Sequence, residues 1–319
     1  MPMAFTVRSL SDLLLDLYQQ ASEASPDQFQ PQALSRLREC LHFDAAAWGG
    51  GWASDRQVTE LNVLNEENAL IEDWKNFRHL DQFCDLTLHR LSTTFSFEDV
   101  ADYRRTTVFN EHWRRFGINH MLATIVAEPL DDYVSFVGLC RHTDSPAFDG
   151  RERQLKELLM PHLAQTLQMN RDNFLSSLDD SEAGMAWIDN CGVVKATRGN
   201  LPAVMRELWS QQQKIPEEIM RSFHQSGSWQ GNGFRLSAKP VKHCWLVKAK
   251  PVTQIDCLTP RETEVASLYA QGHSHKEVAR ELSISPATVR NLLALVYRKL
   301  DVNDKAALCL HWQNATSRS

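Results

Sequence analysis

The sequence predicts a multidomain α+β protein that ends in an all-α segment. The chain has 319 residues, which exceeds the usual size of one domain, and about 100 to 200 residues per domain suggests two or three. Strand-like and amphipathic helical stretches alternate over residues 1–254, whereas residues 255–319 show helical signals only. We therefore expect sheets flanked by helices, followed by a small helical domain.

The composition is that of a globular protein. Hydrophobic residues make up 43% and charged residues 23% of the chain, and no apolar run approaches the ~18 residues of a membrane span. The first twenty residues place Asp12 and Asp16 among leucines without a basic region, so no signal peptide is expected and the cytoplasm is the expected compartment. Seven cysteines without a C-x-x-C pair indicate neither a disulfide framework nor a zinc ribbon.

The first unit begins with helices and continues with strands. Helical spacing covers residues 6–22 and 31–40, with Pro31 suited to a helix start. Further elements follow in order: strands at 43–53 and 57–64, a helix at 66–80, strands at 120–130 and 133–143 joined by the Asp131–Asp132 turn as a hairpin, and a helix at 149–173. The run Gly49–Gly51 is expected to form a strand bend or bulge, with close approach of a ligand to the backbone as the alternative.

A second unit begins after the polar stretch 176–182. Two short strands lie within 184–199 around an Asn190–Gly192 turn, helices follow at 201–213 and 216–225, and strands at 234–240 and 244–250 complete the unit. This order resembles a small or degenerate PAS domain. The expected domains are therefore residues 1–175, 176–250 and, after a linker at 251–257, 255–319.

Four short helices with clear start signals fill the last unit. Thr259 and Glu262 form a capping box around Pro260, and Ser274 with Glu277 forms a second one. Gly272 suits the left-handed end of the first helix. Ser285 can cap a third helix that begins at Pro286 after the turn 283–285. Two helices joined by so tight a turn predict a helix-turn-helix.

The segment LTPRETEVASLYAQGHSHKEVARELSISPATVRNLLALVYRKLDV resembles the DNA-binding domain of the LuxR/FixJ class of bacterial transcription regulators. Its landmarks are the LTPRE start, G-x-S-x-K-E-V-A, S-x-x-T-V-R and the terminal K-L, in one order and spacing. The resemblance implies a four-helix domain that binds double-stranded DNA. Residues 272–300 hold five basic and two acidic groups, whereas residues 1–254 hold 26 basic and 33 acidic groups, so this segment tolerates DNA better than the acidic bulk.

Helical spacing divides the third helix into two faces. Val289, Leu293, Val296 and Leu300 form the inward stripe, and the opposite face presents Ala287, Arg290, Asn291, Ala294 and Arg298 to the major groove. Arg290 suits guanine and Asn291 suits adenine, although either could hold a phosphate. Lys276, Thr288 and Lys299 are expected backbone contacts, helped by helix N-termini. The predicted DNA-binding residues are Lys276, Ser285, Thr288, Arg290, Asn291, Ala294, Arg298 and Lys299.

The helical domain departs from its relatives at a few positions. The family usually shows His at the position of Leu292 and often Asn at that of Leu295, so this flank either alters sequence specificity or packs against another surface. The stretch Asp304–His311 resembles the family's dimerisation helix, and a packing lid on the bundle is the alternative.

The first unit resembles a GAF-like sensor domain. The acyl-homoserine-lactone type of the family is also similar, but its W-x3-Y and D-P signatures are not met; Trp74–Phe77 and Asp81–Gln82 come nearest. Sensor folds of this kind place a mostly apolar pocket between sheet and helices. The candidate ligand-binding residues are aromatic, and each has ordinary core packing as its alternative: Trp48, Trp52, Trp74, Phe77, Phe97 and Trp113.

Together these features predict a sequence-specific transcriptional regulator, not an enzyme. His273 and His275 lack further metal ligands nearby, and no phosphate loop or G-x-S-x-G elbow is present, so neither a metal nor a cofactor is expected. The expected partners are double-stranded DNA, a second copy of the chain and a small apolar ligand, with RNA polymerase as a further candidate and no membrane. The alternative is a ligand-independent regulator whose sensor-like domains mediate dimerisation or protein–protein interaction.

Overall fold

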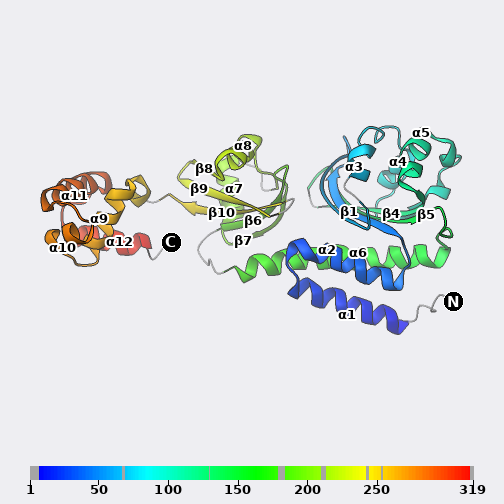
Figure 1. The fold of residues 1–319 in the computed structure, drawn as a ribbon, viewed down its shortest axis with the longest axis horizontal. Coiled ribbons are helices and arrows are strands. Elements are labelled where there is room, and N and C mark those ends of the chain that lie inside the picture. Colours follow the sequence, from blue (N-terminus) through cyan, green and yellow to red (C-terminus); the bar gives the residue numbers. More distant parts are fainter. Residues whose placement is uncertain are drawn as a thin grey trace.

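The structure of the protein is a computed structural model that describes residues 7–66, 69–128, 130–178, 184–209, 213–241, 244–252 and 254–316. These residues form two five-stranded antiparallel sheets followed by a cluster of helices (Figure 1). The mixed α/β architecture with a helical C-terminal region confirms the predicted fold class. Residues 179–182 of the polar stretch 176–182, and residue 183, lie outside the described residues.

The first sheet has the strand order β2-β1-β5-β4-β3. The strands are β1 (Ala45–Trp52), β2 (Gln57–Leu64), β3 (Thr94–Ser96), β4 (Ile118–Ala127) and β5 (Tyr133–His142). The predicted hairpin of β4 and β5 is confirmed. The predicted bulge is confirmed as well, because the register between β1 and β2 shifts at Gly50 and Gly51. A Cβ on Gly49 would lie 2.3 Å from the carbonyl oxygen of Glu60, so only glycine permits this close strand approach.

Helices cover both faces of the first sheet. One face carries α1 (Val7–Glu23), α2 (Pro26–Cys40) and α6 (Gly150–Ser177), and the other carries α3 (Ala69–Trp74), α4 (Gln82–His89) and α5 (Thr107–Glu111) with the 3-10 segments η1 (Phe97–Asp99), η2 (Tyr103–Arg105) and η3 (Trp113–Phe116) (Figure 1). Successive side chains of a strand point to opposite faces. Ala46 and Trp48 therefore pack with α2 and α6, whereas Ala45 packs with α3, α4 and α5.

Two predicted helix boundaries were wrong. The second helix begins at Pro26, after Ser25, and Pro31 lies inside it rather than at its start; Pro26 already supplies the fixed φ that favours a first turn. The expected helix at 66–80 ends at Trp74, and α4 begins eight residues later. Asp81 is the reason for the break, since its carboxylate accepts hydrogen bonds from the backbone N–H groups of Phe83 and Cys84 and so begins a new helix.

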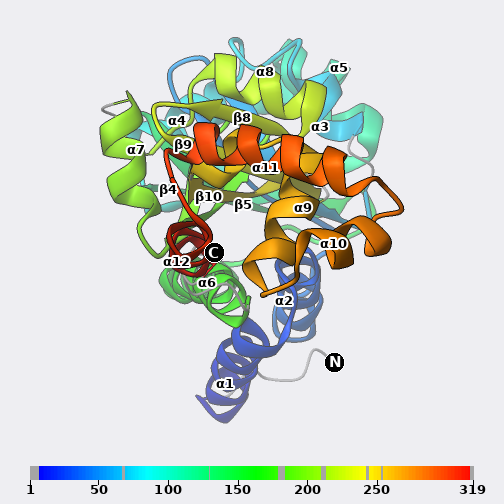
Figure 2. The same ribbon diagram turned by 90° about the vertical axis from the view of Figure 1, so that its left-hand side faces the viewer.

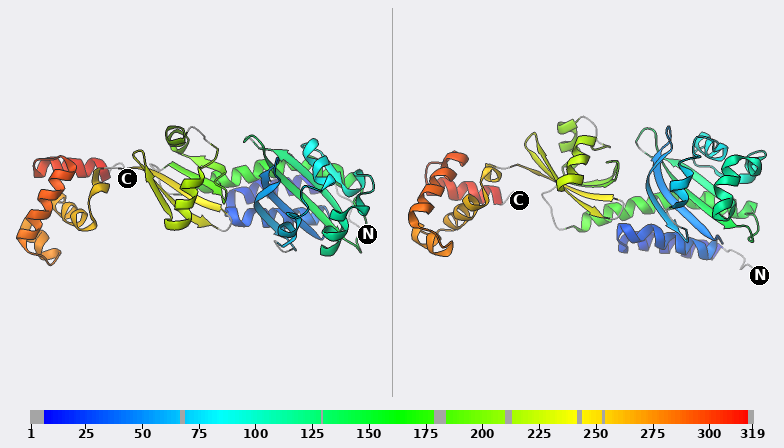
Figure 3. Two further views of the ribbon diagram at one scale, coloured as in Figure 1. Left: turned by 90° about the horizontal axis from the view of Figure 1, so that it is seen from above. Right: turned by 45° about the horizontal axis from the view of Figure 1, so that its top comes forward.

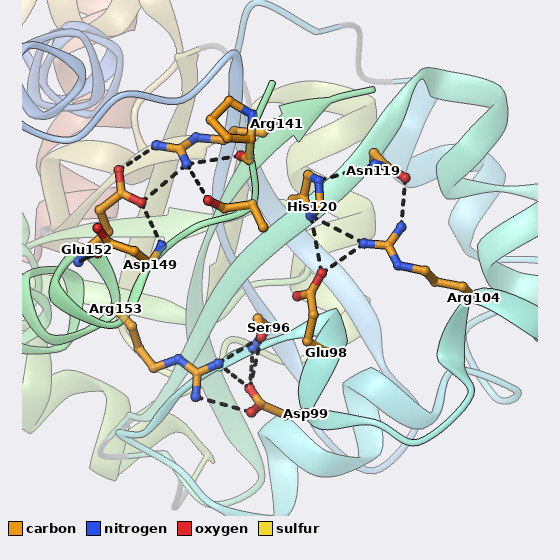
Figure 4. A network of polar contacts seen from close by, with 12 residues as sticks. Ser96, Glu98, Asp99, Arg104, Asn119, His120, Arg141, Asp149, Glu152 and Arg153 are labelled. Carbon is orange, nitrogen blue, oxygen red and sulfur yellow. Dashed lines mark hydrogen bonds and ion pairs between the residues drawn. The ribbon is translucent and has the colours of Figure 1, made fainter. Parts of the chain in front are cut away.

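Charged side chains fix the start of α6 against the first sheet (Figure 4). Asp149 and Glu152 form a capping box. Arg141 is 3% exposed and donates to the carbonyl oxygen of His42 at 2.8 Å as well as to Glu152 at 2.5 Å. Arg153 reaches Asp99 of η1 at 2.6 Å. The helix is therefore held to both β5 and the segment that follows β3.

The second sheet has the strand order β7-β6-β10-β9-β8. Its strands are β6 (Gly184–Asp189), β7 (Val194–Arg198), β8 (Ser228–Gly231), β9 (Phe234–Val241) and β10 (Cys244–Pro251). The helices α7 (Leu201–Trp209) and α8 (Glu217–Ser226) cover one face, and the end of α6 packs on the other (Figure 3). There the ring of Phe174 meets that of Trp187 edge to face, with centres 5.4 Å apart. The predicted strand and helix order is confirmed, and β8 is an additional strand.

The last unit holds four α-helices after the 3-10 segment η4 (Gln254–Cys257). They are α9 (Pro260–Ala270), α10 (His275–Glu281), α11 (Pro286–Leu300) and α12 (Lys305–Thr316) (Figure 2). They share one apolar core, to which α11 contributes Val289, Leu293, Val296 and Leu300. Among the helices of the described residues, none combines the length and apolar character that a membrane span requires.

Candidate functional site

The helix-turn-helix is built by its caps. Thr259 and Glu262 form the predicted capping box of α9, and Ser274 and Glu277 form that of α10. The hydroxyl of Ser285 accepts the backbone N–H of Thr288 at 3.1 Å and so begins α11 at Pro286. The turn between the two helices contains Ser283 in the left-handed region, with φ +52°. The sequence therefore sets where each of these helices begins.

The outer face of α11 is exposed. Its inward stripe is between 0% and 2% exposed, whereas the five residues predicted for the opposite face are all exposed: Ala287, Arg290, Asn291, Ala294 and Arg298. Lys276 at the start of α10 is exposed too. Among the described residues, the ion pairs of the C-terminal helices are Arg261–Glu264 and Lys299–Glu262, and neither includes Arg290, Arg298 or Lys276. Their charges are therefore available to an anionic partner.

Lys299 is placed differently from the other predicted DNA-binding cations. Its ammonium lies 2.7 Å from the carboxylate of Glu262, which is 4% exposed. The hydrogen bond from Lys299, together with that from the backbone N–H of Thr259, lowers the pKa of Glu262. This contact ties α11 to the capping box of α9, which is a structural role that the spacing of the sequence did not reveal.

The helix α12 is anchored to the same bundle. The ammonium of Lys305 donates to the carbonyl oxygens of Gly272 and His273, both at 2.9 Å, and lies 4.2 Å from the ring centre of Tyr269. Leu308 is fully buried in the core, whereas Leu310 is 61% exposed. At the two positions that depart from the family, Leu292 packs partly against the core and Leu295 is 38% exposed.

A cavity lies in the first unit between the sheet and the helices α3 and α4. Its empty volume is about 840 Å³, part of which opens to solvent. Three small residues form its floor: Ala47 of β1 and Ala123 of β4 are both paired with Gly138 of β5. A Cβ on Gly138 would meet only the sulfur of Met121, at 4.0 Å. The cavity therefore exists because the sheet has almost no side chain at its centre on this face.

The charged side chains Asp81 and Arg56 of the cavity wall are bonded to other groups of the protein. Asp81 is 1% exposed and accepts the indole N–H of Trp74 and the hydroxyl of Tyr103, both at 2.8 Å, in addition to its two capping bonds. Arg56 is paired with Asp85. Burial raises the pKa of each of the Cys84 and Cys140 thiols to about 12. The carboxylate of Asp81 and the guanidinium of Arg56 are thus bonded within the protein, and the cavity suits an uncharged, apolar molecule.

The six aromatic residues predicted to bind a ligand lie in different places. Trp52, Trp74 and Trp113 line the cavity. Phe97 stacks on Tyr103 in the surrounding core, and Phe77 packs partly against that core. Trp48 packs against Phe29 on the opposite face of the sheet, with ring centres 6.2 Å apart.

The sequence did not predict the floor of the cavity, because the predicted ligand-binding residues are all aromatic and the floor consists of small residues. A signal did exist: Phe136, Gly138 and Cys140 alternate along β5 and so share one face. Trp74 and Asp81 belong to the two segments that come nearest to the family signatures. In the structure the indole N–H of Trp74 donates a hydrogen bond to Asp81 on the cavity wall. Among the described residues, no group of three or more His, Cys, Asp or Glu side chains is arranged to hold a metal ion.

Residues 256–312 match the protein family described as bacterial regulatory proteins, luxR family. The transcriptional regulatory protein DesR of Bacillus subtilis is 39% identical over 74 residues, which are 23% of this chain and 34% of DesR. The chain thus spans about a third of the length of this relative.

Two solved structures are similar at low scores. The VqsR LBD domain of Pseudomonas aeruginosa has a TM-score of 0.39 and 17% identity, covering 50% of this chain and 95% of that one. SdiA of Escherichia coli has a TM-score of 0.33 and 13% identity, covering 93% and 89%. The family match rests on the sequence of the C-terminal segment. The segment 256–312 of this chain therefore forms a helix-turn-helix domain of the LuxR family of bacterial regulatory proteins.

Proposed function

We propose that the chain is a transcriptional regulator that binds double-stranded DNA through α10 and α11, as a homodimer on a two-fold site in the cytoplasm. The exposed face of α11, which carries Arg290 and Arg298, is the observation that carries this proposal. It belongs to a family-matched helix-turn-helix, in which the second helix enters the major groove. Contact with RNA polymerase is part of the same proposal.

Within this interface, we assign different tasks to different residues. Arg290 and Asn291 form hydrogen bonds with base edges, and the small side chain of Ala294 lets α11 approach the bases closely. Lys276, Ser285, Thr288 and Arg298 contact the phosphate backbone, with Ser285 and Thr288 near the helix N-terminus where backbone N–H groups favour an anion.

The DNA interface is tested with Arg290→Ala and Lys276→Ala in the full-length protein. We expect Arg290→Ala to lose about 1 to 3 kcal/mol of discrimination at one base pair. Lys276→Ala should weaken binding to all sequences and reduce the salt slope by about 1. Binding to a library of random duplexes at several salt concentrations measures both effects. If both variants select and bind DNA as the parent does, the assignment of this face is wrong.

We further propose that a small, largely apolar and uncharged ligand in the cavity controls DNA affinity. The cavity, its small-residue floor and its internally satisfied polar groups support this. A ligand changes DNA affinity only by as much as it binds one arrangement of the chain more tightly than another, which is typically 1 to 3 kcal/mol.

The ligand proposal is tested with N-phenyl-1-naphthylamine, an uncharged apolar fluorophore, and with Gly138→Leu. We expect the probe to bind the parent with raised fluorescence and to bind Gly138→Leu weakly, because the leucine fills the floor of the cavity. Leu158→Ala, a change of an exposed leucine on α6, is the control and should bind like the parent. Equal binding by Gly138→Leu and the parent would favour a ligand-independent regulator whose first unit mediates dimerisation or protein contacts.

A further inference from the structure

The two sheets meet through buried charged side chains. The carboxylate of Glu60 on β2 accepts from Arg171 of α6 at 2.6 Å and lies 3.5 Å from the ammonium of Lys195 on β7. Lys195 also lies 3.6 Å from Asp189 of β6. The side chains of these four residues are between 0% and 9% exposed. We call Glu60, Arg171, Asp189 and Lys195 the interdomain joint.

The interdomain joint favours one arrangement of the sheets. Charges removed from water are tolerated only where their partners are correctly placed, because a displaced partner leaves a buried charge uncompensated. An apolar contact of the same size would permit sliding at little cost. If the second sheet moves relative to the first, the contacts among these four charged side chains must therefore either all break or all move with it.

Tyr133 of β5 connects the joint to the first sheet. Its hydroxyl donates to Asp189 at 3.2 Å and lies 2.7 Å from the hydroxyl of Thr59, which itself donates to Asp189 at 2.7 Å. The ammonium of Lys195 lies 3.7 Å from the centre of the Tyr133 ring. The position of Tyr133 thus determines two contacts with the second sheet.

The other side of this contact is the cavity wall. Trp52, Val58 and Val134 line the cavity, and the two valines are chain neighbours of Thr59 and Tyr133. The ring of Trp52 meets that of Tyr133 edge to face, with centres 5.2 Å apart. The ammonium of Lys214, from the second unit, lies 5.0 Å from the centre of the Trp52 ring. A molecule that displaces Trp52 would therefore disturb its contacts with Tyr133 of the first sheet and with Lys214 of the second unit. Tyr133 in turn bonds directly to Asp189 of the interdomain joint.

We propose that the interdomain joint couples the contents of the cavity to the position of the second sheet, with Trp52 and Tyr133 as the connecting residues. The proposal rests on the proposed ligand-binding function of the cavity. Occupation of the cavity shifts Trp52, Tyr133 follows, and the bonds of Asp189 change. The two sheets thereby move between two docked arrangements. The second sheet directly precedes the helix-turn-helix unit in the chain.

The turn after β6 provides a local readout. One oxygen of Asp189 accepts the backbone N–H groups of Cys191 and Val193, both at 2.9 Å, while the other faces Tyr133 and Thr59. Exchange of the Cys191 and Val193 amides with solvent deuterium therefore reports on the placement of Asp189. Neither amide lies in the cavity wall.

The test measures this exchange in the full chain with two independent changes of the cavity, added N-phenyl-1-naphthylamine and Gly138→Leu. We expect either change to alter the exchange rate at Cys191 and Val193 about fivefold, the effect of one hydrogen bond. Tyr133→Phe removes the connecting hydroxyl and should reduce this response to less than about twofold. Tyr18→Phe is the matched control, because its hydroxyl bonds His162 far from the joint, and it should respond like the parent.

Failure of the probe to bind would contradict the ligand proposal only, since Gly138→Leu still changes the cavity without it. If neither change alters exchange at Cys191 and Val193, the interdomain joint is a static contact and the coupling is overturned. An unchanged response in Tyr133→Phe would equally exclude Tyr133 as the connecting residue.

Discussion

Asp81 combines structural tasks at the cavity wall. One of its oxygens accepts the backbone N–H groups that begin α4 and the hydroxyl of Tyr103, and the other accepts the indole N–H of Trp74. Burial and the neighbouring Asp81 carboxylate raise the pKa of Tyr103 above its ordinary value, so the tyrosine remains a donor. One carboxylate therefore fixes α3, α4 and η2 around the cavity.

Replacing Asp81 by Asn tests this role at a single oxygen. The amide nitrogen of Asp81→Asn would face the indole N–H of Trp74, leaving a buried donor without an acceptor at a cost of about 1 to 3 kcal/mol. Urea unfolding measures the loss. In a Trp74→Phe background the same change should cost less, because the donor is gone; an equal cost in both backgrounds would contradict the assigned bond.

Lys156 is a buried amine on the other face of the first sheet. It is fully buried, bonds to the hydroxyl of Thr124, and has Glu157 as a nearby charge. Burial lowers its pKa from 10.5 to about 7. Between these values the unfolded chain holds a proton that the native chain lacks, so stability rises with pH in this window and the gain is absent below it.

Lys156→Met removes this pH dependence. The free energy of unfolding of the parent should gain up to about 1.4 kcal/mol per pH unit above pH 7 from this one amine. The variant should be more stable than the parent at pH 7, and its advantage should shrink by pH 9. Urea midpoints at pH 7, 8 and 9 measure the difference. Lys75→Met, at a partly exposed lysine paired with Glu72, is the control and should show a constant difference from the parent.

At the scale of single elements, α11 serves two surfaces. Its inward stripe joins the bundle, its outward face carries the proposed DNA contacts, and its last turn is tied to α9 through Lys299 and Glu262. The capping box of α9 and the end of α11 are thus one structure. Lys299, which joins the two, is the chain neighbour of Arg298, whose side chain is exposed.

Lys299→Ala should therefore destabilise the C-terminal helices. Glu262 would remain buried without its cation, at a cost of about 1 kcal/mol because Lys299 is partly exposed and screened by solvent. Thermal unfolding followed by helical circular dichroism measures the change, and Arg298→Ala should leave it unaltered. A Lys299→Ala variant with the melting temperature of the parent and a lower salt slope for DNA would make Lys299 a phosphate contact instead.

At the scale of the whole molecule, the interdomain joint sets how two sheets from different parts of the sequence are docked. Burial alone would raise the pKa of Glu60, but the positive charges of Arg171 and Lys195 outweigh it and the pKa is lowered. The ionised carboxylate of Glu60 thus stabilises docking at pH values above the ordinary glutamate pKa of about 4.3. This contribution is lost as the pH falls through the lowered pKa of Glu60.

Glu60→Gln should weaken the docking at neutral pH. Removing one partner of a buried pair costs about 3 to 5 kcal/mol, and small-angle scattering of the full chain should show a larger radius of gyration at pH 7. The difference from the parent should shrink as the pH falls below about 4.3. Glu72→Gln, at an exposed ion pair, should match the parent, whereas a parent-like radius for Glu60→Gln would show that the charges do not hold the sheets.

Local chemistry decided what could be predicted. Capping residues, hydrophobic spacing and the order of family landmarks depend on neighbours within a few positions. The sequence therefore predicted most of the strands and helices in their order along the chain, the starts of the C-terminal helices and the two faces of α11. It failed where one side chain overrides periodicity, as Asp81 does between α3 and α4. It also could not separate Trp52 from Trp48, since both aromatics suit either face of the sheet.

The sequence by itself thus determined the fold class, the C-terminal helix-turn-helix and the helix that is proposed to read DNA, because these depend on short-range patterns. The tertiary structure alone decided the cavity, the ion pair of Lys299 and the interdomain joint. The floor residues Ala47, Ala123 and Gly138 are 76 and 15 positions apart along the chain and meet only through strand pairing. Glu60 and Lys195 likewise meet only when the two sheets dock, and no local pattern encodes such a contact.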